Sequence, residues 1–284
     1  MLGLAHIGAL EVLESKGLLG CVKEYVGISA GSMAAMSLCI GYTIAELHTI
    51  NNSLDFTLIQ NLDPETMLTF MESYGLDDGR NFDKLLSVLL RAKNLSPEIT
   101  FGEFAEQFPE NPQPRIIATN LQTCLKQEFS VKETPNVSMK FAVLSSACVP
   151  FLFTPVRDLS GNVFVDGGLV AFSPFNLLTD EERSETLAIS FRIQDLFNKS
   201  SIGDGLLAYL KRLFFSGYHH QDTYVQEAWK RHIMYLDTGD AHPFDFKATT
   251  EQKEALFQMG RKGALDFLKF GARFQRPARR NSSP

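Results

Sequence analysis

A serine between two glycines is the first residue in this sequence that could do chemistry. Gly27, Ser29 and Gly31 have the spacing of a Gly-x-Ser-x-Gly pentapeptide, which follows an apolar run and precedes a stretch of small residues. In such a pentapeptide the serine lies on a sharp strand-to-helix turn that exposes its hydroxyl, and the flanking glycines remove Cβ atoms that would collide. The N-terminus of the helix stabilises negative charge. The segment predicts that Ser29 is a nucleophile, and a tight turn in the core is the alternative.

A carboxylate at the end of an apolar run is the second candidate. Asp166 follows Val163–Val165 and precedes Gly167 and Gly168. We therefore expect it at the end of a strand, in a glycine-rich turn that lets its backbone come close to another element. A partly desolvated carboxylate at hydrogen-bonding distance can orient a serine hydroxyl and accept its proton as an ester carbonyl is attacked.

Histidine is the usual base for a serine nucleophile, and four histidines follow Asp166 in the chain. They are His219, His220, His232 and His242. The order serine, aspartate, histidine permits a Ser-Asp-His esterase, but none of the four lies in a local signature of a catalytic base. His219 and His220 are adjacent and cannot share one face of a helix or strand, so they do not indicate a metal site.

Together, the serine and aspartate segments resemble the patatin-like phospholipase family, in which a Gly-x-Ser-x-Gly serine pairs with the aspartate of an Asp-Gly-Gly or Asp-Gly-Ala motif without histidine. Three further segments resemble that family in the same order: Gly3–Gly8, Ala118–Leu121 and Ser145–Pro150. The resemblance covers roughly residues 3 to 180. It implies Ser29 as nucleophile and Asp166 as base, without a metal or cofactor. It also implies a three-layer α/β fold with a mainly parallel central sheet.

The activity that this resemblance implies is hydrolysis of fatty acyl esters. Ser29 would be acylated, the lysolipid or alcohol would leave, and water activated by Asp166 would release the fatty acid. The expected substrate and partner is a phospholipid or another acyl lipid at a membrane surface.

The oxyanion loop of the family is the part of the site that the sequence matches least. Patatin-like enzymes carry Gly-Gly-Gly-x-Arg/Lys-Gly directly before the first helix, and Met1–Gly3 corresponds to its last three positions. We therefore expect the remaining donors at the Ala30 amide and at Gly3. Loss of one donor typically lowers turnover about 100- to 1000-fold. We expect either a truncated or alternatively started enzyme, or a catalytically impaired domain that binds lipid or a protein partner.

These residues need a scaffold, which the hydrophobic pattern predicts. Apolar residues recur at threes between Leu4 and Leu13, which indicates an amphipathic first helix. Residues 43–110 have the pattern of a mainly helical cap. Strands are expected at 25–28, 115–119, 128–131, 163–165, 187–191 and 232–236, and helices at 32–40, 139–146 and about 251–270. Strands that alternate with helices predict an α/β fold with a mainly parallel sheet.

Composition limits the class of protein further. The chain has 284 residues, a net charge of −6 and a hydrophobic content of 44%, which is typical of a globular domain. Net acidity argues against nucleic-acid binding. Four cysteines without a Cys-x-x-Cys pair argue against a disulfide framework. We expect one acyl hydrolase domain over residues 1–270, followed by a basic, disordered tail over residues 271–284.

Two segments bear on the cellular location. Charged residues interrupt residues 1–20, so these lack the pattern of a secretory signal peptide. Residues 25–45 carry no charge and are long enough to span a bilayer, but three glycines and four serines or threonines interrupt them. A buried strand, turn and helix fits these residues better. The expected location is the cytoplasm, at the periphery of membranes.

Overall fold

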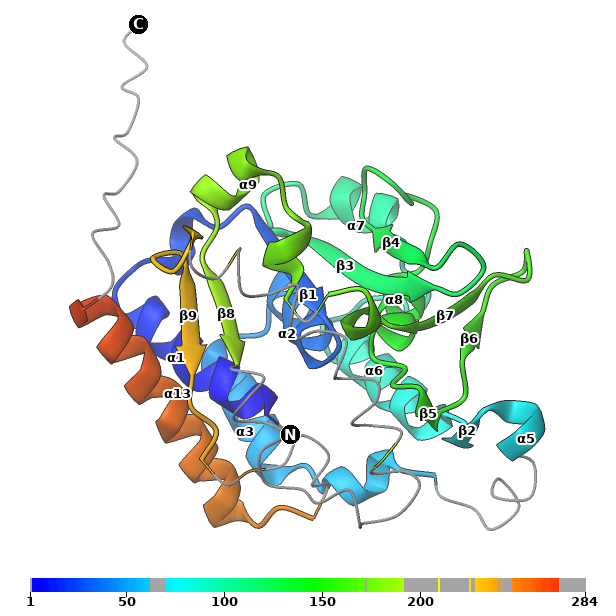
Figure 1. The fold of residues 1–284 in the computed structure, drawn as a ribbon, viewed down its shortest axis with the longest axis horizontal. Coiled ribbons are helices and arrows are strands. Elements are labelled where there is room, and N and C mark those ends of the chain that lie inside the picture. The colour runs from blue at the N-terminus through cyan, green and yellow to red at the C-terminus, as the bar shows by residue number, and fades with distance from the viewer. Residues whose placement is uncertain are drawn as a thin grey trace, which may run out of the picture.

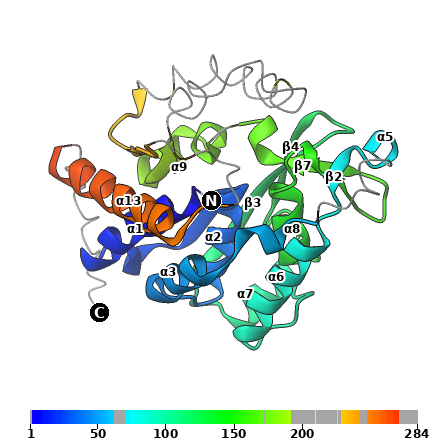
Figure 2. The same cartoon turned by 90° about the horizontal axis from the view of Figure 1, so that it is seen from below.

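Helices alternate with strands along the chain and flank them in space (Figures 1 and 2). The computed structural model describes residues 2–61, 70–171, 173–191, 209, 225, 228–239, 241 and 247–270. The first element is α1 (Gly3–Ser15), followed by the short helix η1 (Leu19–Cys21), and the last described element is α13 (Thr250–Phe270). Both helices lie where the sequence predicts them, but α1 is not amphipathic, because eight of its 13 residues are buried and they lie on several sides of the helix. The predicted tail, residues 271–284, lies outside the described residues.

Five strands form the main sheet, and one of them is central. They are β1 (Glu24–Ile28), β3 (Gln113–Asn120), β4 (Leu125–Phe129), β6 (Val156–Arg157) and β7 (Val163–Asp166). Strand β3 pairs in parallel with β1 and antiparallel with β4 and β7, and β6 pairs antiparallel with β7. Consecutive apolar residues of β3 are buried. Because successive side chains point to opposite faces, both faces of this strand are covered.

The register of β3 brings the ends of β1 and β7 together. Strands β1 and β4 both pair with Ile117, so they lie on opposite edges of β3. Strands β4 and β7 both pair with Ala118, so they too lie on opposite edges. Therefore β1 and β7 share one edge. Ile28, the last residue of β1, is opposite Ile117, and Asp166, the last residue of β7, is opposite Ala118. The two strands meet at their C-terminal ends.

The strand directions correct the expectation of a mainly parallel central sheet. The α/β class with helices flanking a sheet is confirmed, and β1 runs parallel to β3. The other three pairings of the main sheet are antiparallel. Four residues join β3 to β4 and five join β6 to β7, which is too short for the crossover that a parallel pair needs. Parallel pairs recur in two small sheets, formed by β2 (Gly75–Asp77) with β5 (Phe151–Phe153) and by β8 (Ala188–Phe191) with β9 (Ile233–Leu236).

Helices α2 (Ala30–Cys39) and α8 (Met139–Ser146) pack on the main sheet close to the junction of β1 and β7. Their inner faces carry fully buried side chains such as Met36 and Met139, which belong to one continuous cluster with α1 and β3. The described helices include none with the length and apolar character that crossing a bilayer requires. The uncharged residues 25–45 form β1, a turn, α2 and the beginning of α3 instead, as predicted.

The first and last described helices pack backbone to backbone. A Cβ atom at Gly8 of α1 would lie 2.0 Å from the Phe257 carbonyl oxygen, and one at Gly260 of α13 would lie 1.9 Å from the Ala5 carbonyl oxygen. Only glycine permits this approach. Figures 1 and 2 both show the two helices side by side. The contact therefore joins the two ends of the described chain.

Within the range 43–110, the residues that the structure describes are mainly helical, as predicted. They form α3 (Ile44–Ser53), η2 (Phe56–Ile59), α5 (Phe70–Ser73), α6 (Arg80–Ala92) and α7 (Phe101–Gln107), together with the unpredicted strand β2. Thr43 and Thr100 begin α3 and α7 with capping boxes, in which the threonine hydroxyl and a glutamate three positions later satisfy each other's backbone N–H groups. After β7 the chain continues through η3 (Gly167–Leu169), η4 (Pro174–Leu177) and α9 (Asp180–Glu185) to β8.

Candidate active site

Ser29 lies at a sharp turn between β1 and α2. Its φ of 54° and ψ of −126° form a backbone conformation that a residue with a side chain rarely adopts. Helix α2 begins at the next residue, Ala30. Ser29 is partly exposed, whereas Ile28 before it is buried. This is the strained strand-to-helix elbow that the spacing of the pentapeptide predicts.

The two glycines of the pentapeptide differ in their steric role. A Cβ atom at Gly27 would lie 2.4 Å from the Gly31 carbonyl oxygen, so the turn can fold back on the strand only with glycine at position 27. A Cβ atom at Gly31 would meet no atom within 4 Å. The expectation that both glycines prevent collisions is right for Gly27 and wrong for Gly31, which faces open space among the described residues.

Ser146, at the end of α8, ties the elbow to the central strand. The Ser29 backbone N–H donates to the Ser146 hydroxyl oxygen at 3.0 Å, and the Ser146 hydroxyl donates to the Ile117 carbonyl oxygen at 2.6 Å. On the other side of the turn, the Ser32 hydroxyl donates to the Ser29 carbonyl oxygen at 2.6 Å. The backbone of Ser29 is therefore held on both sides, which supports its strained conformation. Sequence reasoning did not assign this role to Ser146.

Asp166 is buried, with a relative exposure of 3%, and its backbone is fixed on both sides. Its N–H donates to the Cys148 carbonyl oxygen at 2.8 Å, and its carbonyl oxygen accepts the Thr119 hydroxyl at 3.0 Å. One carboxylate oxygen, Oδ1, accepts the Gly168 N–H at 2.7 Å. This leaves the second carboxylate oxygen for a further donor.

Close contacts surround both glycines after Asp166, with backbone at Gly167 and with a side chain at Gly168. A Cβ atom at Gly167 would lie 2.2 Å from the Ile117 carbonyl oxygen, and one at Gly168 would lie 2.8 Å from the Asp166 Oδ1 atom. Glycine at both positions lets the turn press against β3 and present its amide to the carboxylate. The prediction that a glycine-rich turn brings this backbone close to another element is confirmed.

Burial controls the charge of Asp166. Loss of solvent raises the pKa of its carboxyl group from 3.8 to about 6, because the ionised form is poorly solvated there. A hydrogen bond from the Ser29 side chain and the amide of Gly168 act in the opposite direction and lower this pKa. The carboxyl group is therefore a stronger base than an exposed aspartate, yet it is largely ionised at pH 7.

The elbow and the carboxylate come together because β1 and β7 end side by side on one edge of β3. Ile117 and Ala118, the partners of Ile28 and Asp166, are consecutive residues, so about one residue rise, roughly 3.4 Å along β3, separates the two positions. The arrangement brings a partly exposed hydroxyl to a buried carboxylate with a raised pKa. Such a pair can transfer the serine proton and generate an oxygen nucleophile.

The beginning of α2 has the properties that an oxyanion site requires. The first N–H groups of a helix have no acceptor within the helix, and the helix dipole favours negative charge there. Ala30 is the first residue of α2 and is exposed. Its amide is therefore suited to the role expected from the sequence. Gly3 is the first residue of α1, and its expected contribution to the oxyanion site stays a prediction.

The histidines are only partly described. His232 lies just before β9, where its Nδ1 atom is 3.2 Å from the Thr186 carbonyl oxygen and its ring packs edge-on against Trp229. His219, His220 and His242 lie outside the described residues. Two described groups form hydrogen bonds that lower the pKa of the Asp166 carboxyl group, namely the Ser29 side chain and the Gly168 backbone amide. The Ser-Asp-His alternative stays open.

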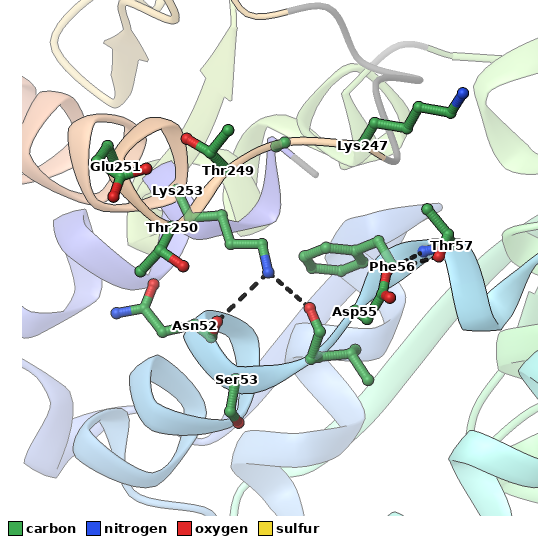
Figure 3. A pocket seen from close by; sticks show the side chains of 12 residues that line it. Asn52, Ser53, Asp55, Phe56, Thr57, Lys247, Thr249, Thr250, Glu251 and Lys253 are labelled. Atoms are coloured by element: carbon green, nitrogen blue, oxygen red, sulfur yellow. Dashed lines mark hydrogen bonds between the residues drawn. The ribbon is translucent and has the colours of Figure 1, made fainter.

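A hollow of about 520 Å³ lies elsewhere, between the end of α3 and the beginning of α13 (Figure 3). The Lys253 ammonium group beneath it donates to the carbonyl oxygens of Asn52 at 3.4 Å and Leu54 at 2.6 Å. It also lies 5.0 Å from the centre of the Phe56 ring. A cation that satisfies the last carbonyl groups of a helix stabilises that helix end. The nucleophile and base candidates do not line this hollow, so we assign it to helix packing.

Comparison with known proteins gives a family and a set of relatives. A family model described as patatin-like phospholipase matches residues 1–179. The uncharacterized protein YqhO of Bacillus subtilis is 26% identical over 290 residues, and the match covers 94% of each chain. The probable lipid hydrolase 463L of Invertebrate iridescent virus 6 is 30% identical over 169 residues, which are 60% of this chain and 57% of the viral protein.

The fold also resembles a solved structure. VipD from Legionella pneumophila superposes with a TM-score of 0.59 at 17% identity. The match covers 95% of this chain and 65% of VipD. At this identity the likeness concerns the fold alone, and this chain spans about two thirds of VipD.

Proposed function

Because the chain belongs to the patatin-like phospholipase family, we propose that it is a serine acyl hydrolase that cleaves fatty acyl ester bonds of phospholipids or related lipids. The observation that carries the proposal is the junction of β1 and β7, where the Ser29 elbow adjoins the buried Asp166 carboxylate. A relative named as a probable lipid hydrolase supports the same class of reaction.

The reaction would proceed through an ester of Ser29. The Ser29 oxygen attacks the acyl carbonyl carbon while its proton passes to Asp166, and the Ala30 amide stabilises the oxyanion. The tetrahedral intermediate collapses, the ester bond to the alcohol breaks, and Asp166 returns the proton to the departing oxygen. Water then attacks the acyl group on Ser29 while its proton passes to Asp166. The bond between the acyl carbon and the Ser29 oxygen breaks, Asp166 returns the proton to that oxygen, and the fatty acid leaves.

A fluorophosphonate probe, which phosphonylates activated serines, tests the nucleophile and the base separately. We expect the wild-type chain to be labelled on Ser29, and Ser29→Ala to abolish labelling. Asp166→Asn should slow labelling at least 100-fold, since general base catalysis contributes about 100- to 10000-fold.

Asp77 supplies a matched control for the aspartate. It is also buried, ends strand β2, and accepts the amide of a glycine two positions later, at 2.8 Å. Asp77→Asn should leave the labelling rate of folded protein within about threefold of wild type. A threefold change corresponds to less than about 1 kcal/mol in the activation free energy. Equal losses in the two aspartate variants would contradict a specific role for Asp166. A folded wild-type chain that is not labelled would instead favour a catalytically impaired domain.

The histidines decide between the proposal and a Ser-Asp-His esterase. Each of His219, His220, His232 and His242 would be replaced by glutamine, and the labelling rate and hydrolysis of a soluble ester would be measured. We expect all four variants to retain activity. A loss of 100-fold or more in one of them, with the fold intact, would establish that histidine as the base.

A further inference from the structure

Two neighbouring turns at one end of the main sheet expose leucine side chains. The turn between β3 and β4 and the first two residues of β4 form a run of six exposed residues, Leu121–Lys126, of which Leu125 has a relative exposure of 65%. In the turn between β6 and β7, Leu159 has a relative exposure of 109%. We call residues 121–126 and 157–162 the leucine turns. Turns are usually polar, and full exposure of leucine is unfavourable in water, so these side chains suggest a contact with an apolar phase.

The two turns form one surface because hydrogen bonds join them. The Gln122 side chain donates to the Gly161 carbonyl oxygen at 3.2 Å and accepts the Val163 N–H at 2.7 Å. The Leu121 N–H donates to the Val163 carbonyl oxygen at 2.9 Å. Figure 1 shows the hairpin of β6 and β7 reaching outward from the body of the molecule, on the side opposite to α13. The leucines therefore stand on a convex tip.

The tip of the second turn is ordered by its own aspartate. The Asp158 carboxylate accepts the backbone N–H groups of Ser160 at 2.9 Å and Asn162 at 2.8 Å, and the Asn162 side-chain amide at 2.7 Å. Gly161 supplies the positive φ, 82°, that closes the turn. Leu159 is thus presented by a fixed backbone, so burying it in another phase costs little additional ordering of the backbone.

The charges of the leucine turns differ in sign from the whole molecule. The chain carries a net charge of −6, yet these turns hold Lys126 and Arg157 against one carboxylate, Asp158, which is occupied within its own turn. Lys126 also lies 3.7 Å from Glu128 on β4. The leucine turns thus carry 2 − 1 = +1 on a protein of net charge −6, which makes them better suited to an anionic lipid surface than the protein as a whole.

The leucine turns are also close to the candidate active site. Leu159 and Asp166 are seven positions apart, so the two are at most about 24 Å apart along the extended chain. That is less than the thickness of the hydrocarbon core of a bilayer, about 30 Å. A protein anchored at this tip would therefore hold Asp166 within about 24 Å of the anchor.

We propose that the leucine turns dock the protein on a bilayer that contains anionic phospholipid, with Leu159, Leu125 and Leu121 inserted and Lys126 and Arg157 at the level of the head groups. The inference rests on the proposed function, because it is the lipid substrate that makes a bilayer the relevant partner. A convex tip fits a deformable lipid surface, whereas a protein partner would require a complementary hollow of its own.

Sedimentation with vesicles tests the docking surface without turnover. The Ser29→Ala chain, which cannot consume lipid, is mixed with vesicles of phosphatidylcholine containing 30% phosphatidylserine. We expect the Ser29→Ala chain to bind these vesicles. Adding Leu159→Glu and Leu125→Glu together should weaken this binding at least tenfold. Lys126→Gln with Arg157→Gln should weaken binding to these vesicles about 30-fold, or roughly fivefold per cation, and binding to pure phosphatidylcholine much less.

Leu265 supplies the matched control. It is exposed to 48% on α13, on the far side of the molecule, and Leu265→Glu makes the same kind of substitution at one position. We expect this variant to bind like its parent. Equal weakening by Leu265→Glu, or unchanged binding of the Leu159/Leu125 variant, would overturn the proposal. Capture of a protein in place of vesicles by the leucine turns would also contradict it.

A second readout separates failure of the docking surface from failure of the proposed function. In the chain with Ser29 intact, the Leu159/Leu125 variant should lose at least tenfold in hydrolysis of vesicle phospholipid and keep its rate on a soluble short-chain ester. Loss of both activities alike would contradict docking. If wild type hydrolyses neither substrate, the proposed function fails, and the sedimentation experiment still decides the docking surface.

Discussion

Asp166 must be charged to act as a base, although its position disfavours charge. Burial raises its pKa to about 6, so the protonated, inactive form dominates below that pH and the ionised form above it. We expect kcat/KM for a soluble ester, and the rate of fluorophosphonate labelling, to rise about tenfold per pH unit below pH 6 and to level off above it. Both rates would be measured from pH 4.5 to 8.5, with circular dichroism at each pH to show that the chain is folded.

The result that contradicts this assignment is a rate that does not change between pH 5 and pH 7. An exposed aspartate with the ordinary pKa near 3.9 would give that result, because it is already ionised at pH 5.

Ser146 is expected to act on the reaction by positioning Ser29. Ser146→Ala leaves the Ser29 N–H and the Ile117 carbonyl group without their partner, which costs about 1–3 kcal/mol where such groups stay buried. We expect kcat for the soluble ester to fall roughly 10- to 100-fold with KM changed less than threefold, because a displaced nucleophile slows chemistry more than binding. Steady-state kinetics and urea unfolding would measure the two effects.

Ser145 is the control for this variant. It is adjacent and fully buried, and its hydroxyl has no hydrogen-bond partner among the described residues. Ser145→Ala should therefore leave kcat and stability close to wild type. If the two alanine variants behave alike, the hydrogen bonds of Ser146 do not position the nucleophile.

The sequence predicts residues with local signatures and misses those whose role depends on tertiary contacts. Ser29 and Asp166 stand out because glycines at fixed spacing accompany them, and the contacts of Gly27, Gly167 and Gly168 give the steric reason. Ser146 could not be assigned, because its hydroxyl acts on a residue 117 positions away. The only sequence signal for Ser146 was its position in Ser145–Pro150, a segment that resembles the patatin-like family.

At the scale of elements, the packing of α1 on α13 depends on two glycines. A methyl group at Gly260 would lie 1.9 Å from the Ala5 carbonyl oxygen, so the helices would have to move apart. We expect Gly260→Ala and Gly8→Ala each to lower the free energy of unfolding by about 3 kcal/mol, at the upper end of the usual cost of overpacking. Urea denaturation followed by circular dichroism would measure it.

Gly20→Ala is the control, because a Cβ atom there would meet no atom within 4 Å. It should change stability by less than about 0.5 kcal/mol, as is usual for substitutions without special contacts. The double variant at Gly8 and Gly260 should cost less than the sum of the two single changes, because one separation of the helices relieves both collisions. Additive losses would contradict this contact.

The existence of the elements was more predictable than their pairing. The helix over 139–146 and the strands near 115–119 and 163–165 were predicted within about two residues, because apolar periodicity and capping residues are local. The antiparallel pairing of β7 with β3 has no local signal, since it joins Ala118 to Asp166 across the intervening helix α8. The alternation of strands and helices favoured a parallel sheet. The short connection between the strands expected at 115–119 and 128–131 argued otherwise, whereas the turn before β7 follows β6, a strand that was not predicted.

At the scale of the whole molecule, one continuous core connects the two ends of the described chain. Buried residues of α1, β3, β9 and α13 belong to the same cluster, including Leu10, Ile116, Met234 and Phe257. Segments that share a core tend to unfold together. The single domain over residues 1–270 stays a prediction, and a natural probe can test it.

The chain has one tryptophan, Trp229, which packs against Phe175 with ring centres 6.2 Å apart. Its fluorescence reports on this one place in the fold, whereas far-UV circular dichroism reports on all the helices. If residues 1–270 form one domain, tryptophan fluorescence and circular dichroism should give the same midpoint of urea unfolding. Gly8→Ala, in a helix far from Trp229 in the sequence, should lower both midpoints equally, because a loss of stability in one cooperative unit is shared by every probe. A Trp229 transition that stays in place while the circular dichroism transition moves would instead divide the chain into two units, with Trp229 and α1 in different ones.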